Sequence, residues 1–298
     1  MLPKIFLIYL LIPLIYPHSI PYSDQLSRHK LIYAAIAAYG TVPRYCMDRG
    51  FNDTAEIKRQ ITVSCDTVDS GDTCSGFTAV SHEDEAILMV FRGTTSTEQL
   101  IVEGAETVFG RQDQLRMCVR SHLDIQTSVH TKFQTPWPSG GFVSEYFSNA
   151  FFKIWSSGMK DDFNGLISKY PGYQVWVTGH SLGGAMASLA ASYLRFNRLV
   201  SSENLLLVTF GQPRTGNLTY AQSVDTLVDN AYRITHSHDP VPHVPGKGHH
   251  GGYWHHKSEV FYNQKMTGWE ICEEDEGQRC SNANAVDLSF ETSTIWQN

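Results

Sequence analysis

The chain has 298 residues, of which 42% are hydrophobic, 12% aromatic and 18% charged, and its formal net charge is -7. This composition can fill a sizeable core, which excludes a disordered chain. The acidic balance argues against a nucleic-acid-binding protein with a basic face and against attachment to anionic membranes by charge. Length by itself allows either one or two domains.

The N-terminus has the pattern of a secretory signal peptide, which we expect over residues 1–20. Lys4 precedes an apolar run, Ile5 to Tyr16, that is shorter than the roughly 20 residues of a membrane span. No later stretch is long and apolar enough to be a transmembrane segment. Cleavage is expected between Pro17 and Ser23, and the alternative is an ordinary buried segment. The signal predicts a secreted, extracellular protein.

The first part of the mature chain predicts two helices and a hairpin. Helical spacing predicts a helix over 24–39. Two apolar runs, 76–81 and 86–91, are separated by polar residues and predict a pair of strands. A long amphipathic pattern rich in Phe, Trp and Leu predicts a helix over 144–169.

Strands and helices then alternate along the chain. Because the strands are apolar almost throughout, they are typical of a mostly parallel sheet that helices cover on both faces, an α/β fold. No linker, repeat or long charge run interrupts the sequence, so one domain is expected over 21–298. The strands are expected at 174–178, 205–210 and 232–236, and the helices at 182–197 and 220–229.

Six cysteines agree with export, because an even number in an exported protein suggests disulfides. Six cysteines allow fifteen connectivities, but two pairs flank short polar loops, and local pairing is favoured. No spacing typical of structural zinc occurs. The expected disulfides are Cys65–Cys74, Cys272–Cys280 and, for the remaining two, Cys46–Cys118.

Two sequons are also compatible with the secretory route: Asn52-Asp-Thr54 and Asn217-Leu-Thr219. The histidine-rich stretch His249–His256 raises a metal hypothesis, but no cysteine or carboxylate ligand lies nearby, and a solvated loop is the better interpretation. No metal or organic cofactor is therefore expected.

The segment Gly179-His-Ser-Leu-Gly183 matches the pattern G-x-S-x-G and lies between a predicted strand and a predicted helix. In that context the pattern predicts a nucleophile elbow, a strained turn that exposes a serine and needs glycines where side chains would collide. Ser181 is the candidate nucleophile. The alternative is a glycine-rich helix start that only packs.

A serine nucleophile needs a histidine to take its proton and an acid to orient that histidine. Asp239 is the best candidate acid, because it follows the predicted strand 232–236 directly and Pro240 ends that strand. Asp225 and Asp229 are weaker, since they lie in or at the end of a predicted helix. An Asp-Pro turn without chemistry is the alternative for Asp239.

The transition state also needs backbone donors for its oxyanion. One is expected from the N–H of Leu182, the residue after the nucleophile. Thr94, in the loop after the strand 86–91, is the expected second donor. An ordinary turn is the alternative interpretation of this loop.

These motifs together resemble the class 3, or fungal-lipase-like, family of α/β-hydrolases over roughly residues 25 to 282. The resemblance implies Ser181 as nucleophile, Asp239 as triad acid, an oxyanion hole at Thr94 and Leu182, and an ester lipid as substrate. It also implies that Thr97 to Phe109 is the region where a helical lid covers the site in some members and could contact a lipid surface; plain packing of this segment is the alternative. The matching motifs are Phe91–Ser96, Val129–Phe133, Val177–Gly184, Thr209–Gly216 and His238–Pro245.

The chain departs from the family at the histidine. Members usually carry it in an Asp-His-x-x-Tyr segment after Cys-Ser-Asn; here Cys280-Ser-Asn282 is present, but no histidine follows His256. Three explanations are open: a truncated or alternatively spliced product without its base, an enzyme that uses another of the histidines at 249–256, or an active enzyme with a different true ending. His255, or else His256, is the expected substitute.

The sequence therefore predicts a secreted serine hydrolase that cleaves carboxylic esters of lipids through an acyl-enzyme. The alternative is a catalytically silent pseudoenzyme that keeps the pocket and binds a lipid or a protein partner.

Overall fold

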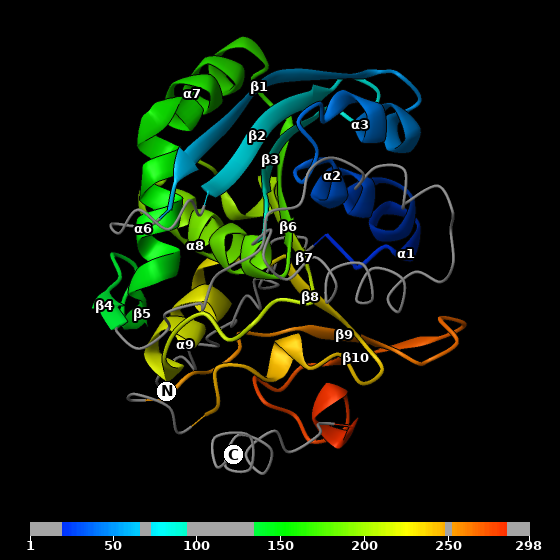
Figure 1. The fold of residues 1–298 in the computed structure, drawn as a ribbon, viewed down its shortest axis with the longest axis vertical. Coiled ribbons are helices and arrows are strands. Elements are labelled where there is room, and N and C mark those ends of the chain that lie inside the picture. The colour runs from blue at the N-terminus through cyan, green and yellow to red at the C-terminus, as the bar shows by residue number, and fades with distance from the viewer. Residues whose placement is uncertain (1–19, 66–72, 94–133, 248–251, 285–298) are drawn as a thin grey trace, which may run out of the picture.

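The computed structural model describes residues 20–65, 73–93, 134–247 and 252–284. Its centre is an eight-stranded sheet in the order β1-β2-β3-β6-β7-β8-β9-β10 (Figure 1). The five strands from β3 to β9 are parallel, and antiparallel strands complete both edges. The strands are β1 Ala55–Ser64, β2 Thr73–Ser81, β3 Ala86–Phe91, β6 Gln174–His180, β7 Leu205–Phe210, β8 Ala231–His236, β9 Glu259–Tyr262 and β10 Trp269–Cys272.

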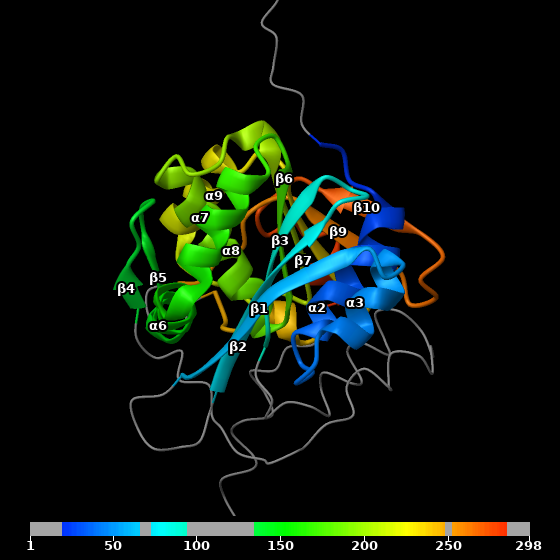
Figure 2. The same ribbon diagram turned by 90° about the horizontal axis from the view of Figure 1, so that it is seen from above.

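Helices lie on both faces of this sheet, α1 to α3 on one side and α6 to α9 on the other (Figure 2). A small second sheet pairs β4 with β5. The α-helices are α1 Asp24–Leu26, α2 Ile32–Ala37, α3 Arg44–Phe51, α6 Glu145–Ile154, α7 Lys160–Lys169, α8 Leu182–Phe196 and α9 Leu218–Leu227; β4 is Gln134–Pro136, β5 is Phe142–Ser144, and the short helices are η1 Ser27–Leu31, η2 Trp155–Met159, η3 Ser202–Asn204, η4 Val241–His243 and η6 Ser281–Asn284.

The sheet divides the apolar interior into two large clusters. Val177 of β6 packs into the cluster beneath α6 and α8, whereas the neighbouring Trp176 packs into the cluster beneath α2. Because side chains alternate along a strand and both faces are covered, the central strands are apolar at nearly every position. The predicted mostly parallel, doubly covered sheet is confirmed, and one domain over 21–298 stays a prediction.

One predicted element is wrong in detail, because residues 144–169 do not form a single helix. Gly158 takes a φ of 128°, which interrupts the run between α6 and α7. Arg59 of β1 packs there, donating from Nη2 to the Gly158 carbonyl at 3.0 Å and pairing with Asp162. The positive φ favours glycine at this turn, and a Cβ on Gly158 would also lie 2.6 Å from that guanidinium.

Two of the three predicted disulfides are present, Cys65–Cys74 and Cys272–Cys280. Cys46 is also disulfide-bonded, and Cys118, its expected partner, lies outside the described residues. Of the two sequons, Asn52 is exposed in a left-handed turn after α3. Asn217 is half-buried and caps α9, its side chain accepting from the Tyr220 N–H.

No helix within the described ranges is long and apolar enough to cross a membrane. The predicted signal peptide falls almost wholly on residues 1–19, outside those ranges.

Candidate active site

Ser181 lies in a strained turn between the end of β6 and the start of α8. Its φ of 56° and ψ of -129° are rare for any residue with a side chain. The turn is held by backbone hydrogen bonds, from the Ser181 N–H to the Phe210 carbonyl at 2.9 Å and from the Gly184 N–H to the Ser181 carbonyl at 2.8 Å. Such an outlier between a strand and a helix is the geometry that the elbow pattern predicts.

The glycines of the pattern are required by close backbone contacts. A Cβ on Gly179 would lie 2.3 Å from the Gly183 carbonyl oxygen, and one on Gly183 would lie 2.2 Å from the Phe91 carbonyl oxygen. The second contact places the first turn of α8 directly on the end of β3. The glycines therefore bring the loop after β3 beside the nucleophile.

That loop is the expected source of an oxyanion donor. A Cβ on Gly93 would lie 3.3 Å from the Ser181 Cβ and 2.8 Å from the His180 carbonyl oxygen, so the loop passes against the elbow. Leu182 is the first residue of α8, a position whose N–H has no acceptor within the helix. Thr94, the other expected donor, lies outside the described residues, as does the expected lid at 97–109.

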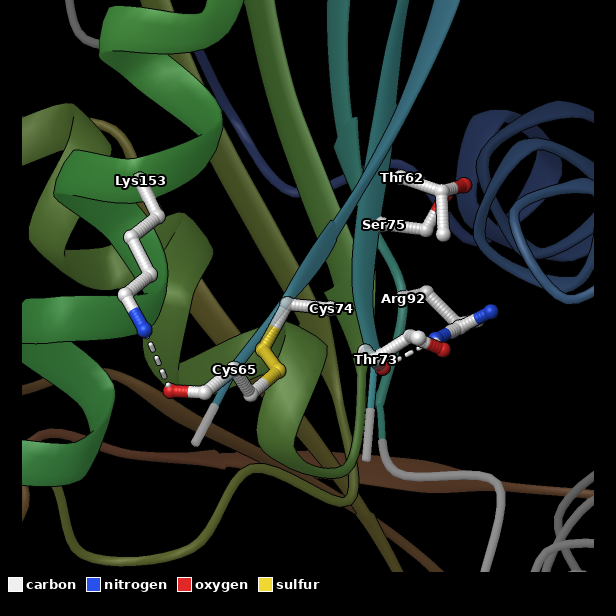
Figure 3. Close-up of a disulfide and its surroundings, with 7 residues drawn as sticks. All are labelled: Thr62, Cys65, Thr73, Cys74, Ser75, Arg92 and Lys153. Atoms are coloured by element: carbon white, nitrogen blue, oxygen red, sulfur yellow. Dashed lines mark hydrogen bonds between the residues drawn. A yellow bond between two sulfur atoms is a disulfide. The ribbon is translucent and has the colours of Figure 1, made fainter. Parts of the chain in front are cut away.

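Arg92 connects this loop to the disulfide between β1 and β2, a role that the sequence did not reveal. Its Nη2 donates to the Thr73 hydroxyl at 2.8 Å, and its N–H donates to the Ser75 carbonyl at 2.8 Å (Figure 3). Cys74 lies between these partners and is bonded to Cys65, whose carbonyl accepts from Lys153 at 3.0 Å. A small pocket that includes Cys74, Phe147, Leu182 and Met186 lies beside this anchor.

Asp239 is near the elbow because β6, β7 and β8 are parallel neighbours and their carboxyl ends meet. A Cβ on Gly211, just after β7, would lie 2.9 Å from Asp239 Oδ2 and 3.7 Å from His180 Nε2. The Asp239 carboxyl and the His180 ring therefore border the same glycine. The carboxyl also accepts from the Val241 N–H at 2.9 Å.

Burial raises the pKa of Asp239 to about 6, against the smaller opposing effect of the Val241 N–H. A buried carboxyl that pairs with a cation has its pKa lowered instead. Asp225, a weaker candidate, lies in α9 and accepts the Lys257 N–H at 2.7 Å; burial raises its pKa to about 6 as well.

Three of the histidines, His180, His255 and His256, are buried, and burial favours their neutral forms. A hydrogen bond of 3.1 Å joins His180 Nδ1 to the Tyr39 hydroxyl. Burial lowers the pKa of His180 to about 4. His255 donates from Nε2 to the Pro242 carbonyl at 2.7 Å, and His256 bonds through Nδ1 with the Lys257 carbonyl. Burial holds the pKa of His255 well below 6.5 and lowers that of His256 to about 3.

The rings of the two expected bases, His255 and His256, are thus hydrogen-bonded to backbone carbonyls. Among the described residues, no hydrogen bond joins either ring to Ser181 or Asp239. His249 and His250 lie outside those residues. The same part of the chain contains no group of three histidines, cysteines or carboxylates that could hold a metal ion.

Comparison with known proteins places these observations in a family. The family model for class 3 lipases matches residues 88–249. Lipase ZK262.3 of Caenorhabditis elegans is 31% identical over 309 residues, covering 94% of this chain and 79% of that protein. A Rhizopus niveus lipase is 33% identical over 70% of this chain, and a Penicillium cyclopium secreted mono- and diacylglycerol lipase A is 31% identical over 62% of it. The chain spans about half the length of these two fungal relatives.

Solved structures agree with these relatives. The lipase of Rhizopus microsporus var. chinensis superposes with a TM-score of 0.62 at 26% identity, covering 84% of this chain and 79% of that one. A triacylglycerol lipase whose catalytic centre is described as a serine protease triad superposes with a TM-score of 0.62 at 25% identity, covering 85% and 87%. The fold is that of the α/β-hydrolases.

Proposed function

The chain belongs to the class 3 lipase family, a family of lipid ester hydrolases, and from this we propose that it is a secreted serine hydrolase that cleaves carboxylic esters of lipids through an acyl-enzyme. The observation that carries the proposal is the strained Ser181, held at the carboxyl end of β6 with the Asp239 carboxyl two strands away.

In the proposed reaction, Ser181 Oγ attacks the ester carbonyl carbon while its proton passes to a base. The oxyanion that forms is stabilised by the N–H of Leu182 and by Thr94. The tetrahedral intermediate then collapses, and the alcohol leaves with the proton from the base. Water, deprotonated by the same base, attacks the acyl-enzyme and releases the acid and Ser181.

Asp239 is proposed to orient the base, and a histidine is proposed as the base itself. His255 is our first candidate and His256 the second. Each would have to leave its present carbonyl partner, Pro242 or Lys257, to reach the serine. His249 and His250, which lie outside the described residues, are the remaining candidates in that stretch.

The substrate is proposed to be an acylglycerol or a related ester lipid, because the Penicillium relative is named a mono- and diacylglycerol lipase. Residues 97–109 are proposed to contact the lipid surface. Secretion is supported by the signal pattern, the disulfides and the secreted fungal relative, and glycosylation at Asn52 and Asn217 is proposed with it.

The test is to express the full chain through a secretory route and assay it on soluble short-chain esters and emulsified acylglycerols. Ser181→Ala is the essential comparison, and Ser156→Ala, which changes a serine exposed on η2, is its matched control. Hydrolysis that disappears only in Ser181→Ala supports the proposal. Equal near-background rates in all three proteins would refute it and favour the silent, lipid-binding alternative.

Asparagine substitutions identify the base in an active protein. Selective loss of hydrolysis in His255→Asn supports our first candidate, and selective loss in His256→Asn supports the second. Full activity in both variants would exclude both residues.

A further inference from the structure

We infer that Arg214 and Glu276 are positioning residues that hold the segment carrying Asp239, with Glu276 presented by the loop that the Cys272–Cys280 disulfide closes. The inference rests on the proposed function, in which Asp239 is the triad acid. Neither residue contacts Ser181 or Asp239 through any hydrogen bond that the described residues make, so both would act through the backbone.

Arg214 donates hydrogen bonds to three successive backbone carbonyls in the segment that follows Asp239. Its Nη1 donates to the carbonyls of His243 at 2.5 Å and Pro245 at 3.0 Å, and its own N–H donates to that of Val244 at 2.9 Å. The residue as a whole is only 4% exposed. One buried residue thereby fixes the backbone at 243–245.

The turn between this anchor and the acid is tight. Asp239 accepts the Val241 N–H through Oδ1, and the His243 N–H donates to the Pro240 carbonyl at 3.0 Å. The His243 bond and the bond from the Val244 N–H to the Val241 carbonyl at 3.2 Å form η4, and the Asp239 carboxyl accepts from its first residue, so a shift of 243–245 would move the backbone next to the carboxyl. The position of Asp239 opposite Gly211 therefore depends on where Arg214 holds its carbonyls.

Glu276 holds Arg214 in turn. The two side chains form a bidentate pair, with Nε to Oε1 at 2.8 Å and Nη2 to Oε2 at 2.9 Å, and their side chains are 5% and 4% exposed. Burial by itself would raise the pKa of Glu276, but hydrogen bonds and charge from Arg214 outweigh it and the pKa lies well below its usual range. The fork geometry leaves the guanidinium little freedom to rotate.

Further contacts fasten Glu276 to the same region. Its Oε1 accepts the His255 N–H at 3.0 Å, and its Oε2 accepts Asn282 Nδ2 at 3.3 Å and lies 3.5 Å from Lys247 Nζ. Glu276 itself lies in the loop between Cys272, the last residue of β10, and Cys280. The disulfide thus limits where this carboxylate can move.

The competing explanation is that the Arg214–Glu276 pair stabilises the fold as a whole and does not position Asp239 in particular. The chain offers a control for this explanation. Arg59 and Asp162 form a second bidentate pair, at 2.7 and 2.8 Å, that joins β1 to α7. Loss of that carboxylate should weaken the fold without changing the Asp239 segment. The two pairs differ in what their arginines hold and also in burial, since the Arg59 side chain is 46% exposed and the Arg214 side chain 5%, whereas both carboxylates are buried.

The experiment compares Glu276→Gln with Asp162→Asn in the full secreted chain, using hydrogen exchange of the 237–247 peptide and steady-state hydrolysis of a soluble ester. We expect faster exchange of that peptide only in Glu276→Gln, with kcat lowered by about 10- to 100-fold and KM little changed, since a small misplacement of a catalytic group can cost about 100-fold. Glu276→Asp, which keeps the charge, should recover part of the loss and serves as the test if the glutamine variant does not fold.

Exchange of 237–247 that stays at the wild-type rate in the Glu276 variants would overturn the inference, as would equal changes in Asp162→Asn. So would faster exchange with unchanged kcat in an active protein. If the wild-type chain shows no Ser181-dependent hydrolysis, the proposed function fails, and the exchange measurement still decides whether Glu276 holds this segment.

Discussion

Replacing Asp239 by asparagine should stabilise the folded protein, although it removes a residue proposed for catalysis. Asparagine keeps the oxygen that accepts the Val241 N–H, and it removes a buried negative charge. Burial raises the pKa of this carboxyl from 3.8 to about 6. Since one pKa unit is worth about 1.4 kcal/mol, the buried charge costs about 3 kcal/mol at neutral pH.

The stabilisation expected from Asp239→Asn should increase with pH. An acid whose pKa is raised in the folded state binds its proton more tightly there than in the unfolded chain, so the penalty is complete above about pH 6 and disappears below pH 3.8. Asp239→Asn should therefore gain about 3 kcal/mol over the wild type at pH 8 and only about 1 kcal/mol at pH 4.5.

Urea unfolding of both proteins at the two pH values measures this difference, provided that the m-value is unchanged. Asp161→Asn, at an exposed carboxyl in α7, is the control and should show no comparable gain. A gain that is absent at pH 8, or equal at both pH values, would refute the reasoning. A loss at pH 8 would mean that a cation or an imidazole already stabilises the Asp239 carboxylate, which would favour the enzyme with its base in place.

Three further predictions concern the surroundings of the site. Gly211→Ala should lower the free energy of unfolding in urea by about 1–2 kcal/mol and should also lower kcat, because the φ of Gly211 is +54° and the new methyl would lie 2.9 Å from Asp239 Oδ2. An unchanged kcat would contradict that contact. His180 is buried and its pKa is lowered to about 4, so the folded state resists its protonation and about 3 kcal/mol of stability, fully present above pH 6.5, is lost as the pH falls towards 4. The free energy of unfolding of His180→Asn should therefore fall less over this range than that of the wild type. An equal fall in both proteins would contradict the prediction. Replacing Cys272 and Cys280 by serine should cost about 2–3 kcal/mol, seen as a lower Tm, whereas an unchanged Tm would show that the disulfide does not constrain the unfolded chain.

Local patterns were sufficient to predict the centre of the fold and the strained turn around Ser181. Residues 205–210 form a strand with the predicted bounds, because a strand buried on both faces must be apolar throughout. The glycines around Ser181 are equally informative, since close backbone contacts at a strand-to-helix turn exclude a Cβ at both positions. These features were readable because each constraint acts within a few residues of the chain.

The strands near the edges of the sheet could not be predicted from local sequence patterns. β1 carries three charged residues in its first half, and neither it nor β9 and β10 was predicted. β1 and β10 are the edge strands, which need fewer apolar residues, so their periodicity is weaker; β9, which lies inside the sheet, is only four residues long. The break at Gly158 was missed for a different reason: it lies inside a run with helical spacing, and its partner Arg59 is about one hundred positions earlier in the chain.

The sequence by itself determined the family, the order of the central strands along the chain and the candidates Ser181 and Asp239, because these depend on local spacing. Only the tertiary structure decided that Asp239 faces Gly211 beside the elbow, that His255 and His256 are bonded to backbone carbonyls, and that Arg214 meets Glu276 across 62 residues of chain. Such contacts arise from how the strands pair and the loops pack. A residue's own neighbours in the chain carry little information about them.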